Sequence, residues 1–198
     1  MTDPQPSLPG MPRWHDDPVV RDTISRIRNF GLAVTVVEDL CATHAKDPDA
    51  RAAACPCAYT SGRSLIGEPE LAVYGLGAED AVEVLCDVTE ELDVRSWKRL
   101  VAEKTEIYTE SVDLAVTLVE AVDTTDLRVH RALFPNSPVL QVVWPDDHGF
   151  YPWEQLYSLR PADQYLKGVE GFARDVGPRV ISRATGPNRA QRRKKNRR

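Results

Sequence analysis

One short segment of the sequence concentrates the side chains best suited to chemistry. Asp146, His148 and Glu154 follow one another closely, with Trp144 and Trp153 beside them. Carboxylates and imidazoles transfer protons or coordinate a divalent cation, and the aromatic rings offer flat apolar faces to a ligand. The segment therefore predicts a ligand site, with a hydrolase using the three polar residues, with or without a metal, as an alternative. The competing interpretation is structural: the tryptophans cap the core and the acids hold a turn.

A second segment, which begins at Tyr59 and leads to Glu70, places the hydroxyl groups of Thr60, Ser61 and Ser64 beside Gly62. A hydroxyl nucleophile would need a glycine-flanked elbow and a histidine partner, and the sequence places neither. Gly62 is better explained by a tight turn with positive φ. Whether the protein is an enzyme stays open, and no catalytic residue is assigned. The candidate ligand-binding residues are Tyr59, Thr60, Gly62, Glu70, Trp144, Asp146, His148, Trp153 and Glu154.

The cysteines offer a weaker possibility. Cys41 and His44 form one local pair and Cys55 and Cys57 another, which together would supply the four ligands of a zinc site. Small thiols packed beside a strand explain the same residues without a metal. We therefore expect neither a metal nor a cofactor, and this zinc set remains an alternative.

The C-terminus is strongly basic. The whole chain has 25 Lys and Arg against 30 Asp and Glu, and seven of the basic residues lie after position 186. The rest of the chain therefore carries 18 basic and 30 acidic side chains, a formal charge of -12. Such a tail predicts non-specific, salt-sensitive contact with nucleic acid, or a counter-charge to the acidic body. The seven residues are Arg189, Arg192, Arg193, Lys194, Lys195, Arg197 and Arg198.

These residues must be positioned by a folded domain, and the composition supports one. The chain has 198 residues, of which 42% are hydrophobic, and it contains 15 prolines. We expect a flexible Pro-rich segment at 1–15, a single domain at 16–180 and a disordered basic tail at 181–198. No apolar run is long enough to span a bilayer, and nothing indicates an oxidising compartment. The sequence predicts a cytoplasmic protein without membrane insertion, whose partner is an unidentified small molecule or protein.

Hydrophobic periodicity predicts the elements. A helix should begin after Asp17, with Pro18 at its first position, and stop at Gly31. Further helices are expected from Gly77, around 127–134 and at 162–176, whereas 95–110 is ambiguous. Strands are expected at 32–37, 57–60, 71–76, 112–122 and 139–144, with Val122 on the same face as Leu114. Strands and helices do not alternate strictly, so the expected fold is α+β, a largely antiparallel sheet packed with helices.

Two stretches carry a family resemblance. The first runs from Tyr-Thr-Ser-Gly at 59–62 to Pro-Glu-Leu at 69–71 and Gly-Leu at 75–76. The second is Leu-Gln-Val-Val-Trp-Pro-Asp at 140–146, followed by Pro-Trp-Glu at 152–154. Their combination and order resemble the bacterial domain-of-unknown-function family 4262, over roughly residues 30 to 155. The resemblance implies a family and no activity. The chain departs from that pattern at Arg63, where leucine is usual, and at Glu68, where histidine commonly stands.

Overall fold

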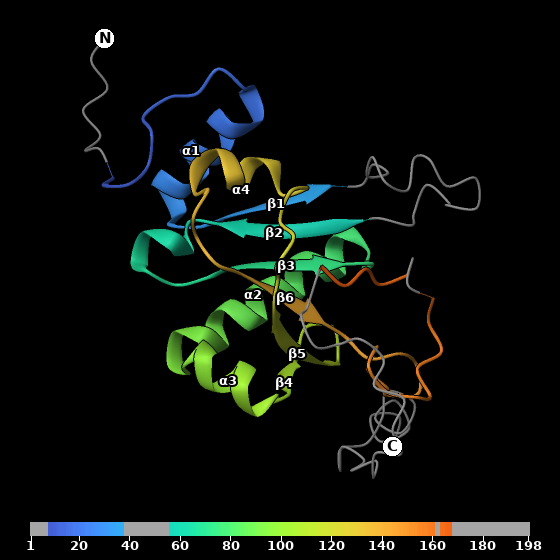
Figure 1. The fold of residues 1–198 in the computed structure, drawn as a ribbon. Helices are drawn as coiled ribbons and strands as arrows, with labels where there is room; N and C mark the ends of the chain where they lie inside the picture. Colours follow the sequence, from blue (N-terminus) through green and yellow to red (C-terminus); the bar gives the residue numbers. More distant parts are fainter. Residues whose placement is uncertain (1–7, 38–55, 161–162, 168–198) are drawn as a thin grey trace, which may run out of the picture.

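The computed structural model describes residues 8–37, 56–160 and 163–167. It has the expected α+β architecture, in which one mixed sheet lies between helical layers (Figure 1). The helices are α1 (Pro18–Phe30), α2 (Ala78–Val94), α3 (Trp97–Glu103) and α4 (Arg128–Leu133), with a short 3-10 helix η2 (Arg63–Ile66). The strands are β1 (Ala33–Val37), β2 (Cys57–Ser61), β3 (Glu70–Tyr74), β4 (Ile107–Thr109), β5 (Leu114–Glu120) and β6 (Val139–Val143).

The sheet consists of two antiparallel halves joined by one parallel pair. Its strand order is β1-β2-β3-β6-β5-β4. The pairs β1–β2, β2–β3, β4–β5 and β5–β6 are antiparallel, which confirms the expected largely antiparallel sheet. Strands β3 and β6 run parallel at the centre, with Glu70 opposite Val139 and Val73 opposite Val142. All five residues of β2, β3 and β6 are buried, as expected for central strands covered on both faces.

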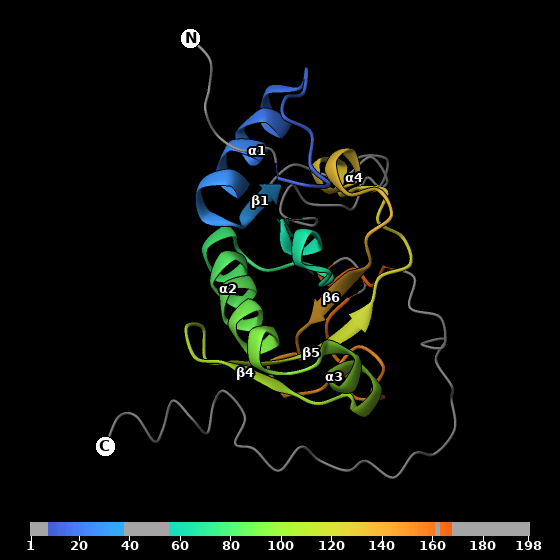
Figure 2. The ribbon, with the colours of Figure 1, turned by 90° about the vertical axis from the view of Figure 1, so that its left-hand side faces the viewer.

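Each face of the sheet has its own apolar core. On one face α2 and α3 pack against Leu71, Val73, Leu140 and Val142. On the other, α1 and α4 pack against alternate residues of the same strands, including Ala72. Figure 2 shows α2 and α4 on opposite sides of the sheet. This alternation follows from the strand geometry, in which successive side chains point to opposite faces.

The ends of α1 are set by its caps, as the sequence predicts. The Asp17 carboxylate accepts a hydrogen bond from the backbone N–H of Val19 at 2.8 Å, and Pro18 occupies the first helical position. Gly31 ends the helix in the left-handed region, and its N–H donates to the carbonyl of Ile27. The helix predicted from Gly77 is also confirmed. Its predicted apolar positions are all buried: Ala81, Leu85, Val88 and Leu92.

The remaining elements differ in part from the sequence predictions. The ambiguous stretch 95–110 forms α3 and β4. Strand β5 ends at Glu120, so Val122 lies beyond it and 63% of its surface is exposed, contrary to its expected place on the buried face. Most of the helix predicted at 162–176 lies outside the described residues. Its described part, 163–167, is not helical, because Gln141 and Val122 bond to its backbone.

Packing extends closer to the N-terminus than the expected boundary at residue 16. Met11 is buried in the core formed by α1 and α4, and Leu8 packs against the same core. The carbonyl of Arg13 accepts a hydrogen bond from the guanidinium of Arg28 on α1. The described residues before α1 are thus part of the packed structure. Among the helices that the structure describes, none combines the length and apolar composition needed to cross a membrane.

Candidate functional site

The first signature segment forms a turn around the buried carboxylate of Glu70. One carboxylate oxygen, Oε2, accepts a hydrogen bond from the Thr60 hydroxyl at 2.7 Å. The other, Oε1, accepts from the backbone N–H of Gly62 at 2.8 Å and from both the N–H and the hydroxyl of Ser64, at 3.0 and 2.8 Å. The Thr60 hydroxyl also accepts from the N–H of Leu71 at 2.8 Å. Glu70 is fully buried, so these donors supply the stabilisation that water would give an exposed carboxylate.

Gly62 is required at this turn for two reasons. Its φ is +128°, a region that side chains rarely adopt, and a Cβ there would lie 2.6 Å from the carbonyl oxygen of Gly31. The prediction of a tight turn at Gly62 is therefore confirmed. The neighbouring Arg63 is buried, donates to the carbonyl of Pro69 and pairs with Asp93 at 3.4 Å. The turn therefore lies against Gly31 at the end of α1, and hydrogen bonds to Glu70 stabilise it.

The second signature segment forms another turn, organised by Asp146. Its Oδ1 accepts from the backbone N–H groups of His148 and Phe150, at 2.9 and 3.0 Å. Its Oδ2 accepts from the N–H and the hydroxyl of Ser158, at 2.8 and 2.7 Å. Burial alone would raise the pKa of Asp146, but these hydrogen bonds outweigh it and lower the pKa. Glu154 similarly accepts from the N–H of Tyr151 at 2.7 Å.

The two tryptophans are half-buried and pack against two separate groups of buried apolar residues. The indole N–H of Trp144 donates to the carbonyl of Tyr74 at 2.9 Å. Trp153 stacks on Tyr151, with ring centroids 5.1 Å apart and an interplanar angle of 2°. The side chain of His148 is exposed.

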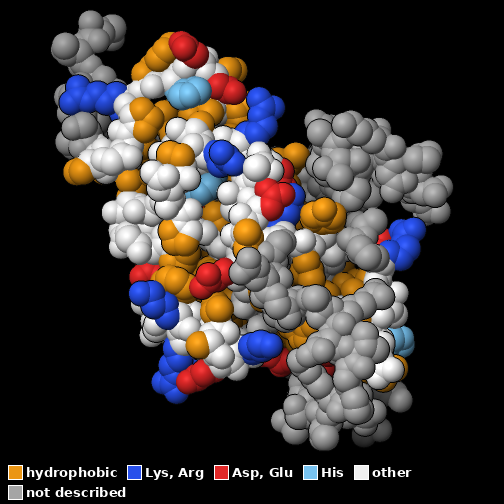
Figure 3. Space-filling model, viewed as in Figure 1, with side chains coloured by type: hydrophobic (Ala, Val, Ile, Leu, Met, Phe, Trp, Pro, Cys, Tyr) orange, Lys and Arg blue, Asp and Glu red, His pale blue; other side chains and the backbone are white. Residues whose placement is uncertain are grey.

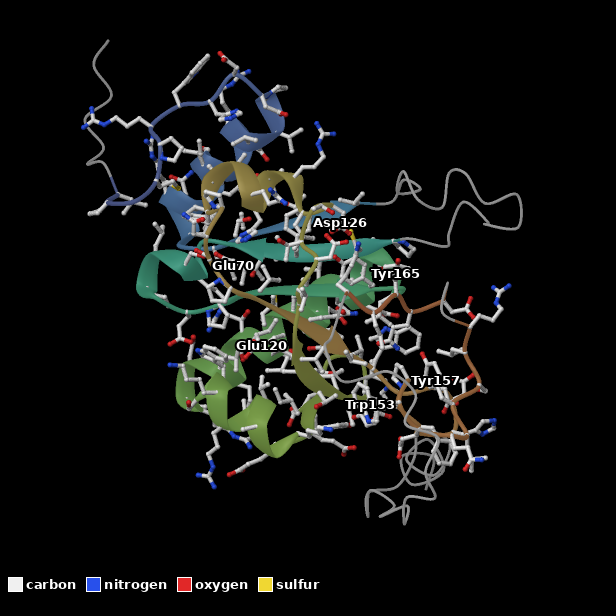
Figure 4. The ribbon with its side chains drawn as sticks, viewed as in Figure 1. Glu70, Glu120, Asp126, Trp153, Tyr157 and Tyr165 are labelled. Atoms are coloured by element: carbon white, nitrogen blue, oxygen red, sulfur yellow. The ribbon has the colours of Figure 1, made fainter. Side chains whose placement is uncertain are left out.

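The candidate residues thus form two clusters at opposite ends of the parallel strand pair. Glu70 is opposite Val139 at the start of the pair, whereas Trp144 follows the end of β6. Five residues of extended strand separate these levels by roughly 16 Å. Figure 4 shows Glu70 far from Trp153 and Tyr157. Thr60 and Gly62 belong to the first cluster, and Asp146, His148 and Glu154 to the second.

Tyr59, which precedes Thr60 on β2, borders a groove. This groove has a volume of about 1190 Å³ and opens at the edge of the sheet formed by β1. Most of its exposed lining surface is apolar, although half of the lining residues named below are polar or charged. The main described lining residues are His15, Asp17, Val19, Val20, Thr35, Val36, Val37, Tyr59, Ala78, Glu79, Val82, Glu83, Asp126, Arg128, Val129 and Ala132. They come from both helical layers and from β1 itself.

The Tyr59 side chain is positioned by β2 and by the start of α4. Only 2% of its surface is exposed, and its hydroxyl accepts a hydrogen bond from the N–H of Val129 at 3.3 Å. Burial raises the pKa of Tyr59, so the phenol stays neutral. The groove is therefore bordered by a neutral phenol, by aliphatic side chains and by charged ones such as Glu83, Asp126 and Arg128. Asp146, His148 and Glu154 are not among the described residues that line it.

Sequence reasoning missed a second set of polar residues, one of which lines the groove. Asp126, which lines the groove, accepts hydrogen bonds from the Tyr74 hydroxyl and the Lys167 ammonium. Gln141 accepts a hydrogen bond from the backbone N–H of Lys167, and Gln164 accepts one from the backbone N–H of Trp144. No local motif joins these residues, because they come from distant parts of the chain. Figure 3 shows hydrophobic and charged side chains interspersed on the face seen in Figure 1.

The zinc alternative lies mostly outside the described residues. Cys41, His44 and Cys55 are not described, and Cys57 is buried on β2. Within 8–37, 56–160 and 163–167, no group of three or more His, Cys, Asp or Glu side chains could hold a metal ion. The basic residues after position 186 also lie outside the description.

The architecture and the two turns define an α+β domain whose signature residues are mostly engaged within the fold. Comparison with protein families matches residues 26–158 to the domain of unknown function DUF4262. The match covers more than half of the chain, so the chain belongs to this family. No curated protein and no solved structure matches it.

Proposed function

We propose that this protein is a non-catalytic binding module that takes a small ligand in the groove beside Tyr59. The observation that carries the proposal is the groove itself, about 1190 Å³ of space bordered by a signature residue and by aliphatic side chains. Small-molecule sites have this character: they are concave, mostly apolar, and contain a few polar groups that orient the ligand. Thr35, Asp126 and Arg128 would supply those groups.

The engagement of the other signature carboxylates supports binding over catalysis. Glu70 and Asp146 each accept four hydrogen bonds from their own turns. A general base needs an oxygen within reach of a substrate proton, and these oxygens already hold protein donors. We further propose that the protein acts in the cytoplasm, where the exposed thiol of Cys86 would remain reduced.

A thermal-shift screen of the full chain with metabolites, nucleotides and metal ions tests the proposal. A ligand that binds only the folded state raises the melting temperature as its concentration increases. Ala132→Trp places a bulky ring in the groove and should abolish the shift. Ala102→Trp, at an exposed alanine on α3, is the matched control and should retain it. Mass spectrometry should recover the compound unchanged.

Three outcomes would contradict the proposal. A hit that is converted to product during incubation would indicate an enzyme. A shift that survives Ala132→Trp would place the ligand elsewhere. A screen in which no compound shifts the wild-type melting temperature would leave the groove without a small-molecule role.

A further inference from the structure

Lys167, in the described residues 163–167, is buried, and its ammonium group lies among aromatic and acidic side chains. The ammonium of Lys167 lies 3.0 Å from Oδ2 of Asp126 and 3.8 Å from Oδ2 of Asp123. It also lies 5.5 Å from the ring centroid of Tyr74 and 5.0 Å from that of Tyr165. Only 9% of the Lys167 side chain is exposed. Asp126 and Tyr165 lie near each other in the view of Figure 4.

This arrangement has the features of an ammonium-recognition site. Aromatic faces attract a cation within about 6 Å of the ring centroid, and the attraction grows when the cation is desolvated. Burial alone would lower the pKa of Lys167, but Asp126 and Asp123 outweigh it and raise the pKa, so the amine stays protonated. The Tyr74 hydroxyl donates to the same oxygen of Asp126 at 3.1 Å, which orients the carboxylate toward the cation.

The backbone around the lysine is held independently of its side chain. The Gln141 amide donates to the carbonyl of Tyr165 at 2.6 Å and accepts from the N–H of Lys167 at 2.9 Å. The carbonyl of Lys167 accepts from the N–H of Val122 at 2.9 Å. Gln141 lies on the central strand β6, so the segment is fixed to the most buried part of the sheet. We therefore expect the backbone of Tyr165 to stay in place when the lysine side chain is removed.

We propose that Tyr74, Tyr165, Asp123 and Asp126 form a binding site for a primary ammonium group, which this chain fills with its own Lys167. The side chain acts as an internal ligand that fastens residues 163–167 to the sheet. The proposal goes beyond the small-ligand groove and does not require it, although Asp126 borders both.

Chemical rescue of a truncated lysine tests the site. Lys167→Ala in the full chain removes the three outer methylenes and the nitrogen, which n-propylammonium replaces. The variant should melt roughly 5 °C or more below wild type, because one partner of a buried ion pair is lost. Added n-propylammonium should raise its melting temperature toward wild type in a saturable manner. The same concentrations of n-propanol, and of n-propylammonium with wild type, should have little effect.

Equal rescue by n-propanol would show that the site only accommodates apolar volume, and that result would overturn the proposal. Failure of n-propylammonium to raise the melting temperature of folded Lys167→Ala would overturn it too. Amine acylation of the wild-type chain provides a test that does not depend on the variant folding. Lys167 should react at least roughly tenfold more slowly than the exposed Lys98, because the protein covers its amine and Asp126 raises its pKa. Equal reaction rates would contradict the buried cage.

Discussion

Trp144 and Gln164 exchange two hydrogen bonds, as two residues on adjacent strands would. The N–H of Trp144 donates to Oε1 of Gln164 at 3.0 Å, and Nε2 of Gln164 donates to the carbonyl of Trp144 at 2.7 Å. A side-chain amide thus satisfies the backbone just where β6 ends. Gly75 allows the segment to approach, because a Cβ there would lie 1.9 Å from the carbonyl oxygen of Asp163. Residues 163–167 are consequently packed against the end of β6 and Gly75.

Gln164→Ala should destabilise the fold by about 2 kcal/mol, because it leaves a backbone N–H and carbonyl of Trp144 without these partners. Urea unfolding measures the change. Gln155→Ala, at an exposed glutamine in the same region, should stay within about 0.5 kcal/mol of wild type. Equal effects of the two substitutions would mean that the exchange contributes nothing specific.

Glu70→Gln should cost about 2 kcal/mol or more of unfolding free energy. The substitution preserves the shape of the side chain, but it removes the negative charge that four donors stabilise. It also replaces one carboxylate oxygen by an N–H₂ group, which cannot accept a hydrogen bond from the donor it faces. Glu120→Gln, at an exposed glutamate on β5, is the control and should have little effect. A Glu70→Gln protein as stable as the control would show that the carboxylate charge is dispensable to the turn.

The stability of the fold should fall as the pH drops below about 6.5, through His130. This side chain is 1% exposed, and burial lowers its pKa below the ordinary value of 6.5, opposed by the charge of Glu70. The unfolded chain therefore takes up this proton at a higher pH than the folded chain, and protonation favours unfolding. His130→Gln should lose that part of the pH dependence when urea midpoints at pH 7.5 and 5.5 are compared.

His148→Gln is the control for this pH effect, because His148 is exposed. It should retain the wild-type dependence. If His130→Gln has the same difference between the two midpoints as wild type, another group is responsible for acid sensitivity.

Deleting residues 187–198 should change nucleic-acid binding far more than stability. The deletion removes seven positive charges and leaves an acidic body that nucleic acid repels. Filter binding of mixed-sequence duplex DNA at two salt concentrations should show retention of the full chain at low salt. The logarithm of its binding constant should fall with the logarithm of the salt concentration, with a slope of about 0.9 per neutralised phosphate. Retention of the truncated protein equal to that of the full chain would exclude the tail as the contact, as would the absence of any retention.

The sequence predicted best where local chemistry determines structure. Both ends of α1 follow from Asp17 and Gly31, which act within one turn of their own positions. The turn at Gly62 follows from its conformational freedom. In contrast, the pairing of Lys167 with Asp126 joins residues that no periodicity relates. Residues 163–167 lie at the start of a stretch with helical spacing, 162–176, but Gln141 binds their backbone instead, and that competition is visible only in three dimensions.

The candidate site was predictable to a similar degree. The sequence singled out the two turns because glycine, carboxylate and aromatic residues cluster there. It did not show that Glu70 and Asp146 direct their oxygens inward, because the donors come from turns whose closure depends on the sheet. Tyr59 borders the groove only because β1 forms the edge and α4 returns across β2.

The parallel pair at the centre of the sheet bears on how the chain reaches its native state. Glu70 and Val139 are register partners, yet they lie 69 positions apart in the chain. The antiparallel pairs on either side connect strands that are closer in sequence, so their loop-closure entropy is smaller. Joining the two halves should therefore be the slow event of folding, and substitutions at the β3–β6 contact should slow refolding more than they accelerate unfolding.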